Sequence, residues 1–137
     1  MTRRALAATI PIVLLGGALG GMARYAVDVL GPQELFPWGT LAINVVGAML
    51  LALLPAFRFV HRHHTIPSFL GTGVLGGFTT LSAFSEEARA LVHGGHSDLA
   101  AAYVVGSLGA GLAGVLAVRH LTTPAERAGF HDDEGDE

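Results

Sequence analysis

The sequence predicts an all-α integral membrane protein with four transmembrane helices. Of its 137 residues, 51% are hydrophobic and only 14% are charged, whereas about 25% of the residues of an average soluble domain are charged. Apolar segments occur four times, and each is about as long as the ~20 residues that cross a bilayer as a helix. This composition excludes a disordered chain and argues against an ordinary soluble enzyme.

The first two apolar segments are separated by a predicted turn. The first runs from Ile10 to Leu30 and contains one basic residue, Arg24. The second runs from Trp38 to Phe57 and follows a stretch that contains a glycine and two prolines, which favour a turn. At about 1.5 Å per residue, each segment can cross the hydrocarbon core as a helix.

The third segment, from Ile66 to Val92, is rich in glycine and in hydroxyl side chains. Its centre has the sequence Gly-Gly-Phe-Thr-Thr at positions 76–80, which predicts a helix that is broken at mid-membrane. Such a break is stable only where the freed backbone groups face protein, an ion or water. We therefore expect functional groups near this point.

The fourth segment, from Leu99 to Leu121, contains glycines and alanines that allow close approach of a neighbouring helix. The last residues are dominated by Asp and Glu. We expect one transmembrane domain over residues 1–121 and an acidic, disordered tail over residues 122–137.

The distribution of arginine predicts the orientation of the chain, which contains no lysine. With four spans, Arg89 lies toward one side of the membrane, and six arginines lie toward the other, which both termini share: Arg3, Arg4, Arg58, Arg62, Arg119 and Arg127. Because positive loops stay inside, the sequence predicts a multi-pass plasma-membrane protein with both termini in the cytoplasm.

Several function classes have no support in the sequence. There is no cysteine, so thiolate nucleophiles, thiolate metal sites and disulfide scaffolds are excluded. No grouping of a nucleophile with a base and no phosphate-binding glycine motif is present, so we expect no enzymatic activity. No basic patch suited to nucleic acid occurs either.

Polar residues inside the first two spans are candidates for an ion pathway, because their burial in a membrane is costly. Arg24 favours an anion nearby, and pairing with Asp28 four residues later is the structural alternative. Thr40 and Asn44 lie on one helix face. Asn44 can donate two hydrogen bonds to a dehydrated anion, or it can join two helices.

The third and fourth segments provide further candidates. Ser82 and Phe84 follow the predicted break, and the positive edge of a phenyl ring can contact a small anion, although packing is the common role of such a ring. Tyr103 and Ser107 are spaced four residues apart and form two steps of hydroxyl donors on one helix face.

Three motifs in order along the chain resemble the Fluc/CrcB family of fluoride channels. They are GGALGGMARY at 16–25, PWGTLAINVVG at 37–47 and GGFTTLSAFSEE at 76–87. The resemblance extends over residues 10–121, and the order and spacing of the three motifs make it specific.

The resemblance implies an antiparallel, inverted assembly of two subunits with two narrow pores and a structural sodium ion at the dimer centre. The carbonyls of Gly76 and Thr79 are matched to the sodium ligands, and Glu87 to a glutamate that follows the pore phenylalanines. The residues matched to the fluoride pathway are Arg24, Thr40, Asn44, Ser82, Phe84, Tyr103 and Ser107. The implied activity is passive electrodiffusion of fluoride out of the cell, which gives fluoride resistance.

The chain departs from the family pattern at three positions. Leu81 stands where the family has the first of two pore phenylalanines, Ala83 replaces a hydroxyl residue, and Gly111 replaces the third hydroxyl of the fourth helix. Leucine has no quadrupole to offer an anion, so a pore wall built from Leu81 is expected to be impaired.

The charge bias and Leu81 together suggest a heterodimer with a related chain of opposite orientation, while a homodimer stays possible. Two other functions also stay open at this point. One is a subunit of a small multidrug exporter, although the first span has Arg24 where coupled cation export needs a carboxylate. The other is a non-conducting assembly subunit.

Overall fold

The computed structural model describes residues 3–31, 34–57, 60 and 65–133, and the side chains of residues 9–122 within these ranges. Every regular element in the described part of the chain is helical. The first helix, α1 (Arg3–Leu30), is followed by α2 (Trp38–Leu53) and by a short 3₁₀ turn, η1 (Leu54–Ala56). The last two helices are α6 (Leu81–His93) and α7 (Ser97–Asp133).

Three helices in the described residues are long and apolar enough to cross a membrane. They lie over Thr9–Leu30, Trp38–Ala56 and Ser97–Thr122, close to the first, second and fourth predicted segments. The chain is therefore a multi-pass membrane protein. Few of its large apolar side chains are fully buried, with Tyr103 and Ile43 below 2% exposure, as expected where lipid or another subunit covers the outer surface.

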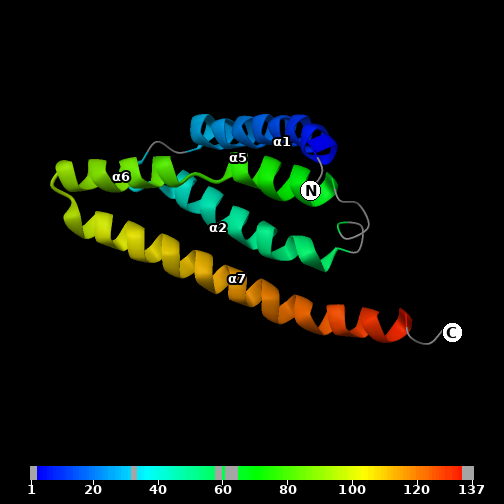
Figure 1. Ribbon diagram of the computed structural model, residues 1–137. Coiled ribbons are helices and arrows are strands. Elements are labelled where there is room, and N and C mark those ends of the chain that lie inside the picture. Colours follow the sequence, from blue (N-terminus) through cyan, green and yellow to red (C-terminus); the bar gives the residue numbers. More distant parts are fainter. Residues whose placement is uncertain (1–2, 32–33, 58–59, 61–64, 134–137) are drawn as a thin grey trace.

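The third predicted segment consists of two shorter helical pieces. The first comprises α4 (Thr65–Pro67), the π-helix η2 (Ser68–Leu75) and α5 (Gly76–Phe78), and the second is α6. Thr79 and Thr80 between them are extended, with ψ angles of 154° and 120°. Figure 1 shows α5 and α6 end to end with this stretch between them. Neither piece is long enough to cross a bilayer alone.

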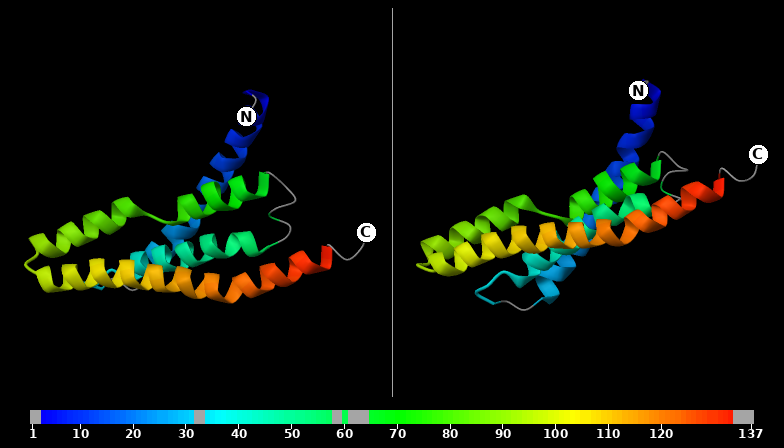
Figure 2. Two further views of the ribbon diagram at one scale, coloured as in Figure 1. Left: turned by 60° about the horizontal axis from the view of Figure 1, so that its bottom comes forward. Right: turned by 90° about the horizontal axis from the view of Figure 1, so that it is seen from below.

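Two groups of contacts hold the pieces in place. The helix α1 packs against η2 and α5, while α2 and α6 pack against α7. In Figure 2, α1 crosses the direction of the other helices. A small core of Leu91, Ala100 and Tyr103 lies between α6 and α7, with Phe36 and Phe84 packed against it.

The helix α7 continues to Asp133, so its backbone is helical over part of the tail that the sequence predicts to be disordered. Residues 134–137 lie outside the described residues, and the domain boundary at residue 121 stays a prediction. Several of the arginines that predict the orientation also lie outside the described residues. Arg58 and Arg62 are not described, and neither are the side chains of Arg3, Arg4 and Arg127.

Candidate functional site

The interruption between α5 and α6 is closed by side chains instead of by a continuing helix. The N–H and the hydroxyl of Thr79 both donate to the Leu75 carbonyl, at 3.0 and 2.9 Å. The hydroxyl of Thr80 caps α6 by accepting the Ala83 N–H at 3.1 Å. This is the usual role of threonine at a helix N-terminus, and it explains why α6 starts at Leu81.

Asn44 on α2 joins the backbone of Thr80 through two hydrogen bonds. Its Oδ1 accepts the Thr80 N–H at 2.8 Å, and its Nδ2 donates to the Thr80 carbonyl at 2.9 Å. In a continuous helix the Thr80 N–H would bind the Gly76 carbonyl. The side chain therefore does connect two helices, and these bonds use one of its two amide protons.

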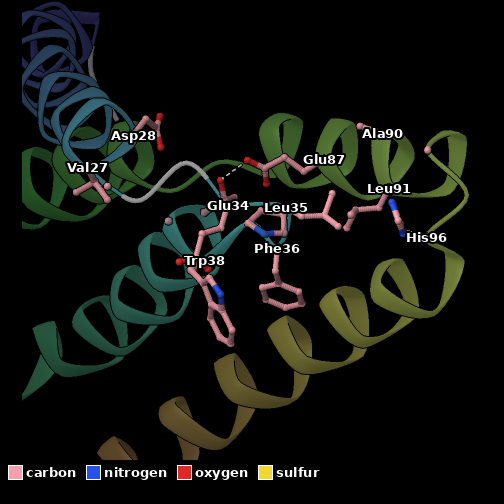
Figure 3. A pocket seen from close by; sticks show the side chains of 15 residues that line it. Val27, Asp28, Glu34, Leu35, Phe36, Trp38, Glu87, Ala90, Leu91 and His96 are labelled. Atoms are coloured by element: carbon pink, nitrogen blue, oxygen red, sulfur yellow. Dashed lines mark hydrogen bonds between the residues drawn. The ribbon is translucent and has the colours of Figure 1, made fainter.

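A carboxylate on α6 links three helices at the next turn. The hydroxyls of Thr40 on α2 and Tyr103 on α7 donate to different oxygens of Glu87, each at 2.7 Å. Figure 3 shows Glu87 among the side chains that line a cavity, together with Asp28 and Glu34. The sequence analysis did not include Glu87 in the pathway, although two hydroxyls destined for burial need an acceptor.

Aromatic rings surround the Tyr103 side chain, which is 0% exposed. The Phe84 ring lies at 5.1 Å between centroids in a tilted arrangement, and the Phe36 ring lies edge-on at 5.6 Å. These are favourable geometries for aromatic pairs. They fix both Phe84 and the Tyr103 hydroxyl relative to Glu87.

Two cavities lie in sequence along this polar face. The first, of about 420 Å³, is lined by Thr40 and Glu87 together with Asp28, Glu34 and Trp38. The second, of about 390 Å³, is lined by Asn44, Thr80, Leu81, Phe84 and Ser107. Because Thr40 and Asn44 are one helical turn apart on α2, the cavities follow each other along that helix.

The second cavity contains an unused hydrogen-bond donor. The Ser107 Oγ is buried and has no partner in the described part of the chain. An unsatisfied buried hydroxyl costs about 1–3 kcal/mol, so this atom calls for an explanation. Ser82 is placed differently, with its Oγ 3.2 Å from the Thr80 Oγ1 on the exposed side of α6.

Arg24 reaches the interruption from α1. Its Nη1 donates to the Thr79 carbonyl at 3.4 Å. The sequence left open whether this arginine serves an anion or pairs with Asp28, and the structure places its positive charge at the break. Arg24 therefore lies near the second cavity, which Thr79 also lines.

The backbone at the break offers oxygen atoms to a cation. The Thr80 N–H is diverted to Asn44, which removes the usual helical donor from the Gly76 carbonyl. Hard monovalent cations are held in proteins by such carbonyls. No cluster of three or more His, Asp or Glu side chains with metal-binding geometry occurs among the described residues.

The chain is similar in sequence to known proteins over most of its length. The model of a family described as CrcB-like protein, Camphor Resistance (CrcB), matches residues 11–118. A "Fluoride-specific ion channel FluC" from Novosphingobium aromaticivorans is 44% identical over 109 residues, which is 75% of this chain and 86% of that protein. A protein of the same name from Cereibacter sphaeroides is 49% identical, over 77% of this chain and 86% of that protein. Another from Agrobacterium fabrum is 44% identical, over 79% of this chain and 90% of that protein.

Proposed function

Since the chain belongs to the CrcB family, we propose that it is a subunit of a fluoride-selective channel that exports cytoplasmic fluoride by passive electrodiffusion. The name of its relatives supports this activity. The observation that carries it is the buried Ser107 hydroxyl without a partner, in a cavity that Asn44 and Phe84 also line. An unpaired donor in such a place suits an anion.

Conduction of a small anion requires donors that replace its water. Thr40 lines the first cavity, and Asn44 and Ser107 line the second. The buried Tyr103 hydroxyl reaches the first cavity through its bond to Glu87. The edge of the Phe84 ring adds a weaker positive contact, and Ser82 continues the hydroxyls on the exposed side of α6. Fluoride would pass from one group of donors to the next, with no single site that holds it tightly.

Glu87 competes with the ion in the first cavity. Its two oxygens accept the hydroxyls of Thr40 and Tyr103, which are donors that an entering fluoride needs. The carboxylate thereby satisfies these donors when no ion is bound. Passage of fluoride through this point requires Glu87 to release at least one hydroxyl, so Glu87 controls entry.

Arg24 supplies the electrostatic attraction. Its guanidinium lies against the Thr79 carbonyl at the break, where a positive charge raises the local concentration of anions. A structural sodium ion would be held by the Gly76 and Thr79 carbonyls and would add positive charge at the same place. Two carbonyls are too few for a complete shell, so a second subunit would supply the rest.

The subunit is proposed to work in an antiparallel pair. The two pieces of the third segment together form a third span that is broken at mid-membrane, giving four spans with both termini in the cytoplasm. With six arginines on one side of the membrane and one on the other, this chain inserts in a single orientation. Leu81 is 77% exposed beside the second cavity, and a related partner would cover it and provide the missing phenylalanine.

The pairing has its own test. The tagged chain is purified from cells that also express a related chain of opposite arginine bias, and the position of its termini is mapped. We expect co-purification of the two chains and a single orientation of this one. Recovery of this chain without a second subunit, in both orientations, would contradict the heterodimer and favour a homodimer.

The channel function is tested by removing the Ser107 hydroxyl. Fluoride efflux is measured from liposomes that contain the paired subunits, with either wild-type chain or Ser107→Ala. Thr122→Ala is the matched control, because its hydroxyl on α7 bonds to the Val118 carbonyl, away from both cavities. We expect at least about fivefold slower efflux for Ser107→Ala and no change for the control. Equal efflux in all three would remove Ser107 from the pathway and with it the observation that carries the channel function.

A further inference from the structure

One line of residues on the outer surface of α6 is polar, beside the exposed apolar side chains of Leu81 and Val92. Ser82, Glu86, Arg89 and His93 follow each other at intervals of four, three and four residues, and all four are exposed. This spacing places them in one line on a helix surface. We call them the α6 stripe. Its inner end is Ser82, whose Oγ lies 3.2 Å from the Thr80 Oγ1 at the break.

The neighbouring helix has an apolar outer face with nearly the same spacing. Val105, Leu108, Leu112 and Leu116 on α7 are 71%, 65%, 62% and 57% exposed. Such a row is suited to lipid or to an apolar partner surface. The contrast shows that the α6 stripe is not a general property of the outer surface of this chain.

The α6 stripe extends deep below the turn that joins α6 to α7. Ser85, next to it, precedes His93 by eight residues, which is about 12 Å along a helix. Gly106 on α7 is exposed and follows Ser97 by nine residues, so the two positions are matched in distance from the turn to within about one residue. Glu86 and Arg89 precede His93 by seven and four residues, which is about 10 and 6 Å along a helix. Inside the hydrocarbon core, charged groups are found where protein or water surrounds them and not where lipid does.

Glu86 and Arg89 form the charged part of the stripe. The guanidinium donates twice to the carboxylate, with Nε–Oε2 and Nη2–Oε1 distances of 3.0 and 2.5 Å. Both side chains are still at least 60% exposed. The pair is therefore not buried against the rest of this chain, and the medium outside it must solvate the remaining surface of both groups.

We propose that the α6 stripe lines a water-filled approach to the break, in which Arg89 attracts anions and Glu86 limits that attraction. The attraction of fluoride in particular rests on the proposed channel function, whereas the presence of water does not. A free guanidinium at the wall of such a passage would raise the local anion concentration more strongly than the paired one. Arg89 thus raises the local concentration of anions, and Glu86 lowers it.

The water-filled passage is tested by single cysteines, since the chain has none of its own. Ser85→Cys and the depth-matched Gly106→Cys are reacted in membranes with a charged, membrane-impermeant methanethiosulfonate. Val105 is avoided as the control because it lines a cavity together with Arg89 and His93. We expect Ser85→Cys to react at least about tenfold faster. Similar slow rates at both positions, with full reaction of both after denaturation, would show that lipid or a partner chain covers the stripe and would overturn the proposal.

The role of the charges is tested by the sign of the reagent. At Ser85→Cys, we compare the reaction rate of an anionic reagent with that of a cationic one. The ratio of the anionic to the cationic rate should rise when Glu86→Gln is added and fall when Arg89→Gln is added, by about threefold or more in each case. The double variant should return near the starting ratio. A ratio that neither substitution changes would contradict the role of Arg89.

Fluoride efflux through the paired channel provides the link to function. We expect faster efflux with Glu86→Gln and slower efflux with Arg89→Gln, and both differences should shrink at high salt, where charges are screened. Fast cysteine labelling without any fluoride efflux would contradict the channel function and leave the water-filled passage standing. Slow labelling with normal efflux would contradict the water-filled passage and leave the channel function standing.

Discussion

The broken third segment is held from two sides by different means. Against α1 the contact is backbone to backbone, since glycines at 16, 20, 73 and 77 leave no room for a side chain. Against α2 and α7 the contact is made by polar side chains, with Asn44 bound to Thr80 and Glu87 bound to Thr40 and Tyr103. The contact with α1 fixes the position of the break, and the contact with α2 and α7 supplies polar groups for an ion pathway.

The difference teaches which substitutions separate folding from function. A change on the glycine side disturbs close packing and should reduce both together. A change on the polar side removes donors or charge while the helices stay packed, so it should reduce conduction more than stability.

The largest effect is expected for Gly20→Ala. Its Cβ would lie 2.0 Å from the Val74 carbonyl oxygen and 2.8 Å from the Phe78 nitrogen, and backbone atoms cannot move aside cheaply. We expect a loss of about 2–3 kcal/mol in unfolding free energy and loss of fluoride efflux. The measurement is thermal unfolding in detergent with size-exclusion chromatography.

The adjacent glycine provides the control for this prediction. A Cβ at Gly21 would meet no atom within 4 Å. Gly21→Ala should therefore preserve folding or stabilise the helix by up to about 1 kcal/mol. Equal behaviour of the two variants would contradict the close approach of α1 to the third segment.

The next effect is expected for Asn44→Asp on the polar side. The carboxylate can still accept the Thr80 N–H, but it loses the donor to the Thr80 carbonyl and places negative charge in the proposed pathway. We expect at least about tenfold slower fluoride efflux, which corresponds to ~1.4 kcal/mol on the barrier. Unchanged efflux from a correctly folded variant would remove Asn44 from the pathway.

A smaller effect is expected for Tyr103→Phe. The ring keeps its contacts with Phe36 and Phe84, and only the hydroxyl that binds Glu87 is lost. Stability should fall by about 1 kcal/mol, and efflux should slow about threefold to tenfold because a donor is missing. Tyr25→Phe is the control, since Tyr25 lies 69% exposed on α1; an equal loss of efflux in both would refute a specific role for Tyr103.

The smallest effect is expected for Gly111→Ser, which adds a hydroxyl one turn after Ser107 in the second cavity. Nothing lies within 4 Å of a Cβ at this position, so stability should change by less than about 0.5 kcal/mol. We expect efflux to rise about twofold, because one more donor serves the ion. Gly106→Ser, on open helix surface outside the cavity, should leave efflux unchanged.

The sequence predicted the helices well where a long apolar run defines them. The predicted bounds of the first, second and fourth segments lie within about two residues of the helices with membrane-spanning character. Hydrophobic length is a local property, so it can be read from the chain directly. The π-helix at Ser68–Leu75 was not predicted, because its wider turn depends on packing against α1.

The structure adds contacts at the candidate site that residue types and spacing do not specify. Asn44 and Thr80 are 36 residues apart, and nothing in the pattern of either segment specifies a pair between an amide and a backbone peptide. The resemblance matches Glu87 to a family glutamate, but nothing in the sequence assigns it a role in the pathway. Its two hydroxyl partners come from separate helices, so only the fold reveals them.

The central claim is that this chain contributes a fluoride-selective pathway. The most direct measurement is ion efflux from liposomes that contain this chain and a related chain of opposite arginine bias, recorded in parallel for fluoride and chloride. We predict rapid fluoride efflux that requires both chains, with no chloride efflux above that of empty liposomes. Rapid fluoride efflux from this chain alone would contradict only the heterodimer. Absence of fluoride efflux in every combination, or equally fast chloride efflux, would contradict the account as a whole.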